Sequence, residues 1–60
     1  GFGPLESLLK DSSVTEIMVN GAQRIFFERD GVIQRSDLRF VDDNHVSRVI
    51  QRILDVVAVA

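Results

Sequence analysis

The side chains that could carry metal or acid–base chemistry are few in this chain. There is one histidine, His45, and no cysteine, so a zinc site with the ordinary number of ligands cannot be built from these residues. Asp42 and Asp43 are adjacent carboxylates, but they precede a helical pattern whose N-terminus either of them could cap. We therefore expect no metal ligand, and we predict that His45 is a solvent-exposed residue in the first turn of that helix.

Nucleophilic catalysis and phosphate binding also lack the residues that they need. The serines Ser12, Ser13, Ser36 and Ser47 have no nearby histidine to act as a base. The glycines do not fit the spacing Gly-x4-Gly-Lys-Ser/Thr, and none lies between a strand and a following helix; they are Gly1, Gly3, Gly21 and Gly31. The sequence thus predicts no catalytic and no cofactor-binding residue, and a chain that neither binds nor hydrolyses a nucleotide by itself.

The length and the net charge of the chain restrict the remaining classes of fold and function. Sixty residues without cysteine make one small domain at most, which must be marginally stable, part of a larger domain, or oligomeric. Seven basic and nine acidic residues give a net charge of −2, spread along the chain, which argues against nucleic-acid binding. No apolar run approaches the length of a membrane span and no signal-peptide pattern is present, so we expect a soluble, cytoplasmic setting.

The elements that position these residues are organised around a predicted β-meander with two turns. Val14–Val19 is rich in β-branched residues, and Asn20-Gly21 and Asp30-Gly31 are dipeptides typical of two-residue type I′ turns. For the first turn, a four-residue loop over residues 20–23 is the alternative. Residues 38–40 are a possible fourth strand.

The Asp30-Gly31 turn predicts the register of the second hairpin. The expected pairs are Arg29 with Val32, Glu28 with Ile33, Phe27 with Gln34, and Phe26 with Arg35. Ile25 and Phe27 then share the core face, because together they are purely apolar. Phe26 lies on the opposite face, where we predict that it is inside a complete domain or forms an interface.

Two helices are predicted to flank the meander. The first is short, from Pro4 to Lys10, and its apolar stripe consists of Leu5, Leu8 and Leu9. The second runs from Asp43 to about Ala58 and lies on the sheet, since its apolar residues recur at i, i+3, i+4 and i+7. The chain then ends in an apolar stretch without a helix stop signal, which we interpret as an artificial cut or as apolar sequence that continues into further structure. The expected fold class is α/β of the α+β type.

Three segments of the chain resemble a known family. They are Gly3-Pro4-Leu5-Glu6 through Asn20-Gly21, then Phe27-Glu28-Arg29-Asp30-Gly31, and then Ile50-Gln51-Arg52-Ile53. The sequence of these segments resembles the N-terminal domain of bacterial type II/IV secretion-system ATPases. Within that family it is most similar to the CpaF-type motor of tight-adherence (Flp) pilus assembly. The resemblance covers nearly the whole chain.

The resemblance implies that residues 1–60 are a fragment of a PAS-like N-terminal domain that precedes a RecA-like ATPase core. In that family the full-length enzyme uses ATP and Mg²⁺, forms a homo-hexamer, and works in the cytoplasm, peripheral to the inner membrane and in contact with secretion or pilus platform proteins. It also implies that the nucleotide motifs lie beyond this chain, so no catalytic residue is transferred. The arginines are expected to shield sheet edges and a solvent face instead of contacting nucleotide; they are Arg24, Arg29, Arg35 and Arg39.

Two further expectations concern partners. A free-standing α/β interaction or sensor module without ATPase activity is the alternative function. For the isolated chain, we expect a two-fold dimer through the second helix or an edge strand, because the short chain leaves apolar surface uncovered.

Overall fold

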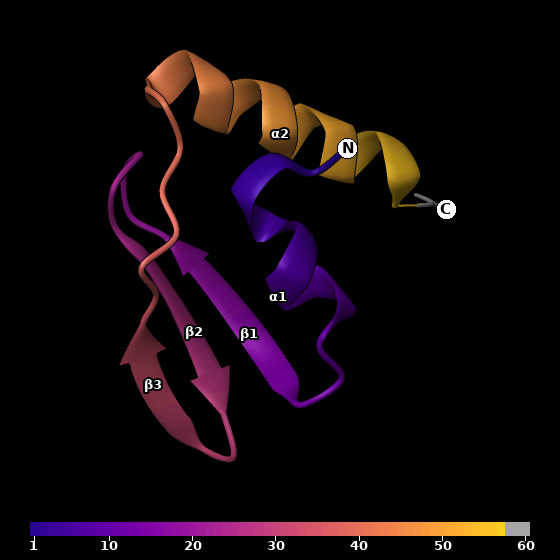
Figure 1. Cartoon of the computed structure of the whole chain (residues 1–60). Helices are drawn as coiled ribbons and strands as arrows, with labels where there is room; N and C mark the ends of the chain where they lie inside the picture. The colour runs from indigo at the N-terminus through magenta and orange to yellow at the C-terminus, as the bar shows by residue number, and fades with distance from the viewer. Residues whose placement is uncertain (58–60) are drawn as a thin grey trace.

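A computed structural model describes residues 1–57 of the chain. A short 3₁₀ turn, η1 (Gly3–Leu5), leads into α1 (Glu6–Lys10) and is followed by the strands β1 (Val14–Val19), β2 (Ile25–Arg29) and β3 (Val32–Arg35), and by α2 (Asp43–Val56). The strands form an antiparallel sheet in the order β1-β2-β3. Figure 1 shows α1 beside β1, and α2 crossing above the N-terminal helices. The fold is therefore α+β, as predicted.

The N-terminal helix spans the predicted residues but begins as a tighter turn. Pro4 lies in η1, where its fixed φ suits the first turn and its missing N–H costs no hydrogen bond. The backbone N–H of Phe2 donates to Oε2 of Glu6 at 3.0 Å, and the other carboxylate oxygen of Glu6 pairs with Nζ of Lys10 at 3.3 Å. Leu5 and Leu8 are buried, whereas Leu9 is 45% exposed.

The second hairpin has the predicted register. Phe26 pairs with Arg35, Phe27 with Gln34, Glu28 with Ile33, and Arg29 with Val32. Asp30 and Gly31 connect the strands with φ values of 53° and 76°, the left-handed conformation that both central residues of a type I′ turn require. Ile25 is fully buried and Phe27 is 9% exposed, which confirms their predicted place on the core face.

The first hairpin is wider than either predicted form. Val19 pairs with Ile25, so five residues, 20–24, separate the two strands, and the two-residue turn at Asn20-Gly21 is wrong. The N–H of Asn20 donates to the carbonyl of Arg24, and a turn inside this pair closes from Arg24 N–H to the Gly21 carbonyl. Only Gly21 has positive φ, at 96°, so a single glycine supplies the reversal.

The possible fourth strand at residues 38–40 does not form within the described chain, and the sheet has three strands. Phe40 donates one backbone hydrogen bond, to the carbonyl of Ala22 in the first hairpin loop, and one such bond does not make a ladder. The segment nevertheless matters for packing, because Phe40 is only 1% exposed. A loop residue thus contributes one of the two largest fully buried side chains.

Helix α2 begins where the sequence predicts. Asp42 is its N-cap, and Oδ1 of Asp42 accepts the backbone N–H of His45 at 2.8 Å. The helix ends at Val56 and Val57 is extended, so the predicted continuation stops earlier; Ala58 lies outside the described residues. On the outer face the side chain of Gln51 donates to Asp55, one turn further on.

The core joins the sheet to both helical parts of the chain. Its buried members are Leu5, Leu8, Ile25, Phe27, Phe40 and Val49. Val49 is the buried residue of α2, and it packs against the N-terminal segment: a Cβ placed on Gly3, whose φ is +53°, would lie 3.2 Å from Cγ2 of Val49. Glycine at this position lets the first residues approach α2 closely.

Candidate functional site

The described residues carry no cluster typical of catalysis or metal binding. Between Gly1 and Val57, no group of three or more His, Cys, Asp or Glu side chains could hold a metal ion. No polar or charged residue within this range is buried. The remaining candidates for a functional site are surfaces that could contact another protein or another part of a larger one.

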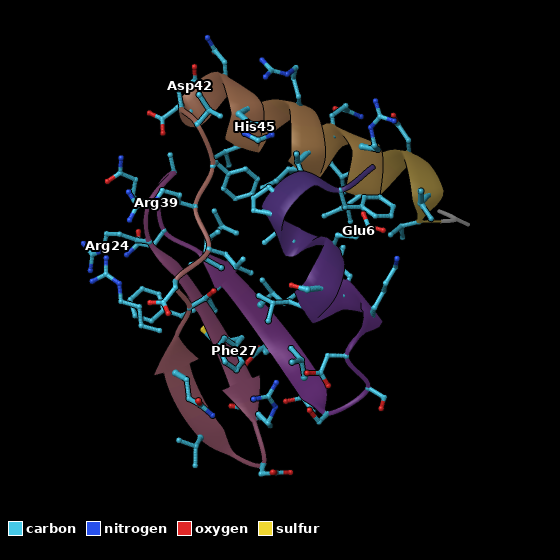
Figure 2. All side chains as sticks on the ribbon, viewed as in Figure 1. Glu6, Arg24, Phe27, Arg39, Asp42 and His45 are labelled. Atoms are coloured by element: carbon cyan, nitrogen blue, oxygen red, sulfur yellow. The ribbon has the colours of Figure 1, made fainter. Side chains whose placement is uncertain are left out.

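The prediction for His45 as a solvent-exposed residue is wrong. Its ring is half-buried and meets the ring of Phe40 edge-on, with centroids 5.2 Å apart. Nδ1 of His45 accepts the backbone N–H of Val41 at 3.0 Å, while the backbone N–H of His45 completes the Asp42 cap. Figure 2 shows Asp42 and His45 together at the start of α2. The histidine thus links the Phe40 loop to the helix, through partners four and five residues before it.

The turn residues named from the sequence lie at the ends of the sheet. Asp30 and Gly31 form one turn, and Asn20 and Gly21 belong to the loop at the opposite end. A Cβ placed on Gly21 or Gly31 would meet no other atom within 4 Å. Their glycines are therefore required for backbone conformation, and no neighbouring group approaches them.

Phe26 lies on the sheet face opposite Ile25 and Phe27. It is half-buried, it is paired with Met18 on β1 and Arg35 on β3, and the guanidinium of Arg35 lies 5.8 Å from its ring centroid. Ile33, which pairs with Glu28 on the same face, is 59% exposed. This face presents apolar side chains beside an acidic and a basic one, a composition suited to protein contact.

The second candidate surface is an apolar groove with a volume of about 510 Å³ between α1, β1 and α2. Residues from all three elements line it, among them Leu8, Leu9, Ile17, Val19, Ile50 and Leu54. The predicted apolar stripe of α2 is divided here: Val49 is buried, but Ile50 and Leu54 are 40% and 56% exposed. We call this surface the β1–α2 groove.

A polar network fixes one corner of the fold. Oδ1 of Asp11 accepts the hydroxyl and the backbone N–H of Ser13 at 2.6 and 2.9 Å, and Oδ2 accepts Nη2 of Arg29 at 2.6 Å. These bonds, first from the Ser13 hydroxyl, then its N–H, then Arg29, lower the pKa of Asp11 to about 2. Arg29 also lies over the Phe27 ring, 5.1 Å from its centroid. The network ties the α1–β1 connection to the end of β2.

Glu6 is the other carboxyl whose pKa is lowered. The main cause is the hydrogen bond from the Phe2 backbone N–H, followed by the bond from Lys10. Both acids therefore hold backbone in place, and their surroundings are those of structural groups.

The four arginines named from the sequence fall into two groups, one that contacts aromatic rings and one that lies near the first hairpin loop. Arg29 and Arg35 lie over aromatic rings of β2, and Nη2 of Arg35 donates to the carbonyl of Gln23. Figure 2 shows Arg24 and Arg39 on the side of the molecule where the first hairpin loop lies, away from His45. None of these contacts identifies a nucleotide site.

Two comparisons with known proteins bear on this arrangement. A search of curated proteins gave no match for the chain. The family described as "Type II/IV secretion system protein" matches residues 1–60, which is the entire chain.

Proposed function

The chain belongs to the type II/IV secretion system protein family, a family of secretion ATPases, and on this premise we propose that it is an N-terminal, non-catalytic part of such an ATPase. The observation that carries the proposal is the family match over residues 1–60. The described residues add that the conspicuous surfaces are the β1–α2 groove and the sheet face that carries Phe26, Glu28, Ile33 and Arg35, which we call the Phe26 face; both are suited to contact with protein. The proposed role is movement against a downstream ATPase core as nucleotide is bound and released.

The finer assignment is a CpaF-type motor of Flp pilus assembly. This assignment is supported by the amino-acid sequence of residues 3–21 and 27–31, which resembles that subfamily. In this proposal the full-length protein is a homo-hexamer that uses ATP and Mg²⁺ and contacts platform proteins. Its place is the cytoplasmic side of the inner membrane; within residues 1–57 there is no helix long and apolar enough to cross a membrane.

The reading frame and the enzyme provide the decisive test. We expect a Gly-x4-Gly-Lys-Ser/Thr motif downstream of residue 60, and an ATPase activity of the purified full-length protein that is lost when the lysine of that motif is replaced. Size and mass measurements on the same protein with bound nucleotide should give a hexamer. A stop codon directly after residue 60 would instead support a free-standing interaction module.

Phe26 offers a test of the coupling role in the full-length protein. If the Phe26 face contacts the ATPase core or a neighbouring subunit, Phe26→Ala should lower the ATPase rate of the hexamer while the isolated chain stays folded. Val41→Ala is the matched control, because Val41 is 80% exposed and lies outside both proposed surfaces. Equal ATPase rates for Phe26→Ala and the parent would argue against a contact at this face.

A further inference from the structure

A small basic hollow lies between α2 and the first residues of the chain. Its volume is about 260 Å³, and it is lined by Gly1, Gly3, His45, Arg48, Val49 and Arg52. No acidic side chain lines it, although the chain as a whole has a net charge of −2. The local charge is thus opposite to that of the molecule.

The acidic residues near the hollow are engaged elsewhere. Glu6 accepts the Phe2 N–H and pairs with Lys10, Asp42 caps α2, and Asp55 accepts from Gln51. Arg48 and Arg52 make no ion pair with any residue between 1 and 57. Their guanidinium groups remain available for an external anion.

The spacing of the two arginines is unfavourable for the helix. Arg48 and Arg52 are one turn apart on α2, and like charges at this spacing destabilise a helix. No ion pair of Arg48 or Arg52 within residues 1–57 compensates for this repulsion. Such an unfavourable placement of charges is expected where the residues serve binding.

One wall of the hollow is shaped by a close approach that glycine favours. Gly3 has φ +53°, and a Cβ at this position would lie 3.2 Å from Nε2 of His45. Because Nδ1 of His45 accepts the Val41 N–H, the hydrogen of the neutral ring resides on Nε2. Nε2 is therefore a hydrogen-bond donor on the hollow side of the ring, beside the two arginines.

We propose that this hollow binds the carboxylates of an acidic helix on a protein partner. Side chains four residues apart on a helix have Cβ atoms about 5–6 Å apart, so two glutamates one turn apart match Arg48 and Arg52. Each guanidinium can hold one carboxylate through two N–H groups, and the buried Val49 forms an apolar floor between them. Charge complementarity therefore selects the partner, and the assignment does not depend on the proposed function.

The test uses the chain itself and a defined probe. A helical peptide with two glutamates four residues apart is titrated into the ¹⁵N-labelled protein at low ionic strength, and the same peptide with glutamines serves as its control. The amide signals of Gly3, His45, Arg48 and Arg52 should shift with the glutamate peptide only. Replacing both arginines (Arg48→Gln with Arg52→Gln) should weaken binding about tenfold, since each exposed ion pair contributes modestly.

A second pair of arginines serves as the control for a general effect of lost positive charge. Arg24→Gln with Arg39→Gln removes the same charge from the other side of the molecule and should leave the affinity unchanged. Arg48→Lys keeps the charge but loses the two-donor geometry, so it should give an intermediate affinity. The Arg48/Arg52 variant should melt at the parent temperature or above it, because like-charge repulsion is removed.

Three outcomes would overturn the proposal. The control pair could weaken binding as much as the Arg48/Arg52 pair, which would reveal a general charge effect. The glutamine peptide could shift the same signals to the same extent. Finally, inorganic phosphate could bind the same residues more tightly than the peptide does, which would assign the hollow to phosphate groups.

Discussion

Asp11 shows how one half-buried carboxylate can organise the junction between α1 and the sheet, although no polar side chain among the described residues is fully buried. It lies after α1, and its three hydrogen bonds reach Ser13 and the far end of β2 at Arg29. Those three donors favour the ionised form, because each N–H or O–H stabilises negative charge on the acceptor. The turn-rich segment 11–13 thus acquires a charge-dependent attachment to the sheet.

The first prediction follows from this pKa. The folded pKa of Asp11, about 2, lies below the ordinary value of 3.8, so its ionised form stabilises the fold above pH 4. This contribution should disappear as the pH falls from about 4 to about 2. Asp11→Asn should therefore show a smaller decrease of the thermal midpoint over that range than the parent. Glu6→Gln serves as a comparison for the second lowered carboxyl, and superimposable pH profiles of Asp11→Asn and the parent would contradict the assignment.

The second prediction concerns Gly31 at φ 76°. Valine is β-branched and strongly disfavoured at positive φ, so Gly31→Val should reduce the free energy of unfolding by about 2 kcal/mol. Asp30→Gly is the matched change, because glycine at φ 53° relieves strain and should be tolerated. Urea unfolding of both variants provides the measurement, and a Gly31→Val midpoint equal to that of the parent would show that the turn is placed incorrectly.

At the level of elements, the sequence is most informative where local rules decide the structure. The register of the β2–β3 hairpin follows from Asp30-Gly31 alone, since a two-residue turn leaves one possible pairing. The N-cap Asp42 and the start of α2 follow in the same way. In both cases the deciding groups are neighbours along the chain.

The two incorrect strand predictions concern the first hairpin loop and the segment that contacts it. The Asn20-Gly21 dipeptide permits a tight turn, but the pairing of Val19 with Ile25 gives a wider loop. In the same region the Ala22 carbonyl accepts the N–H of Phe40. That bond and the burial of Phe40 give residues 38–40 a packing role without a strand ladder. Nothing local in residues 38–40 indicates this outcome.

The apolar stripe of α2 shows the same distinction. Its helical period was predictable, but which of its residues are buried depends on what lies opposite. Gly3 allows the N-terminal segment to contact α2 beside Val49, and Figure 1 shows the helix crossing above that segment. Ile50 and Leu54 consequently line the β1–α2 groove. The candidate surface thus arises from tertiary packing that periodicity cannot specify.

The third prediction tests the Phe40 loop. Replacing a buried phenylalanine by alanine costs about 3–5 kcal/mol, while a natural chain of this length has only about 3–9 kcal/mol of stability in total. Phe40→Ala should therefore unfold most of the population, and Phe40→Leu should fold with reduced stability. Val41→Ala, at a site 80% exposed, should stay within about 0.5 kcal/mol of the parent. Circular dichroism during urea unfolding separates these outcomes, and a stable Phe40→Ala would show that the loop is not part of the core.

On the scale of the whole molecule, the chain is flat, and part of its apolar surface is exposed to solvent. Its Cα atoms extend over 30 × 28 × 16 Å, and its accessible surface is 4404 Å². A stable interface covers about 800 Å² on each partner, roughly a fifth of this surface. One broad side of such a slab can supply that area.

The final prediction is that the isolated chain self-associates through the β1–α2 groove. Leu9, Ile50 and Leu54 are 45%, 40% and 56% exposed there, and β1 is an edge strand of the described sheet. Edge strands and contiguous apolar side chains favour pairing with a second copy, most simply about a two-fold axis. Sedimentation over a wide concentration range should show a monomer–dimer equilibrium. Leu54→Lys should shift it toward monomer, whereas Val41→Lys, which places the same charge outside the groove, should leave it unchanged. A monomer at every concentration would mean that the groove is too shallow or too polar at its rim to hold a second copy, and an equal effect of both lysines would locate the contact elsewhere.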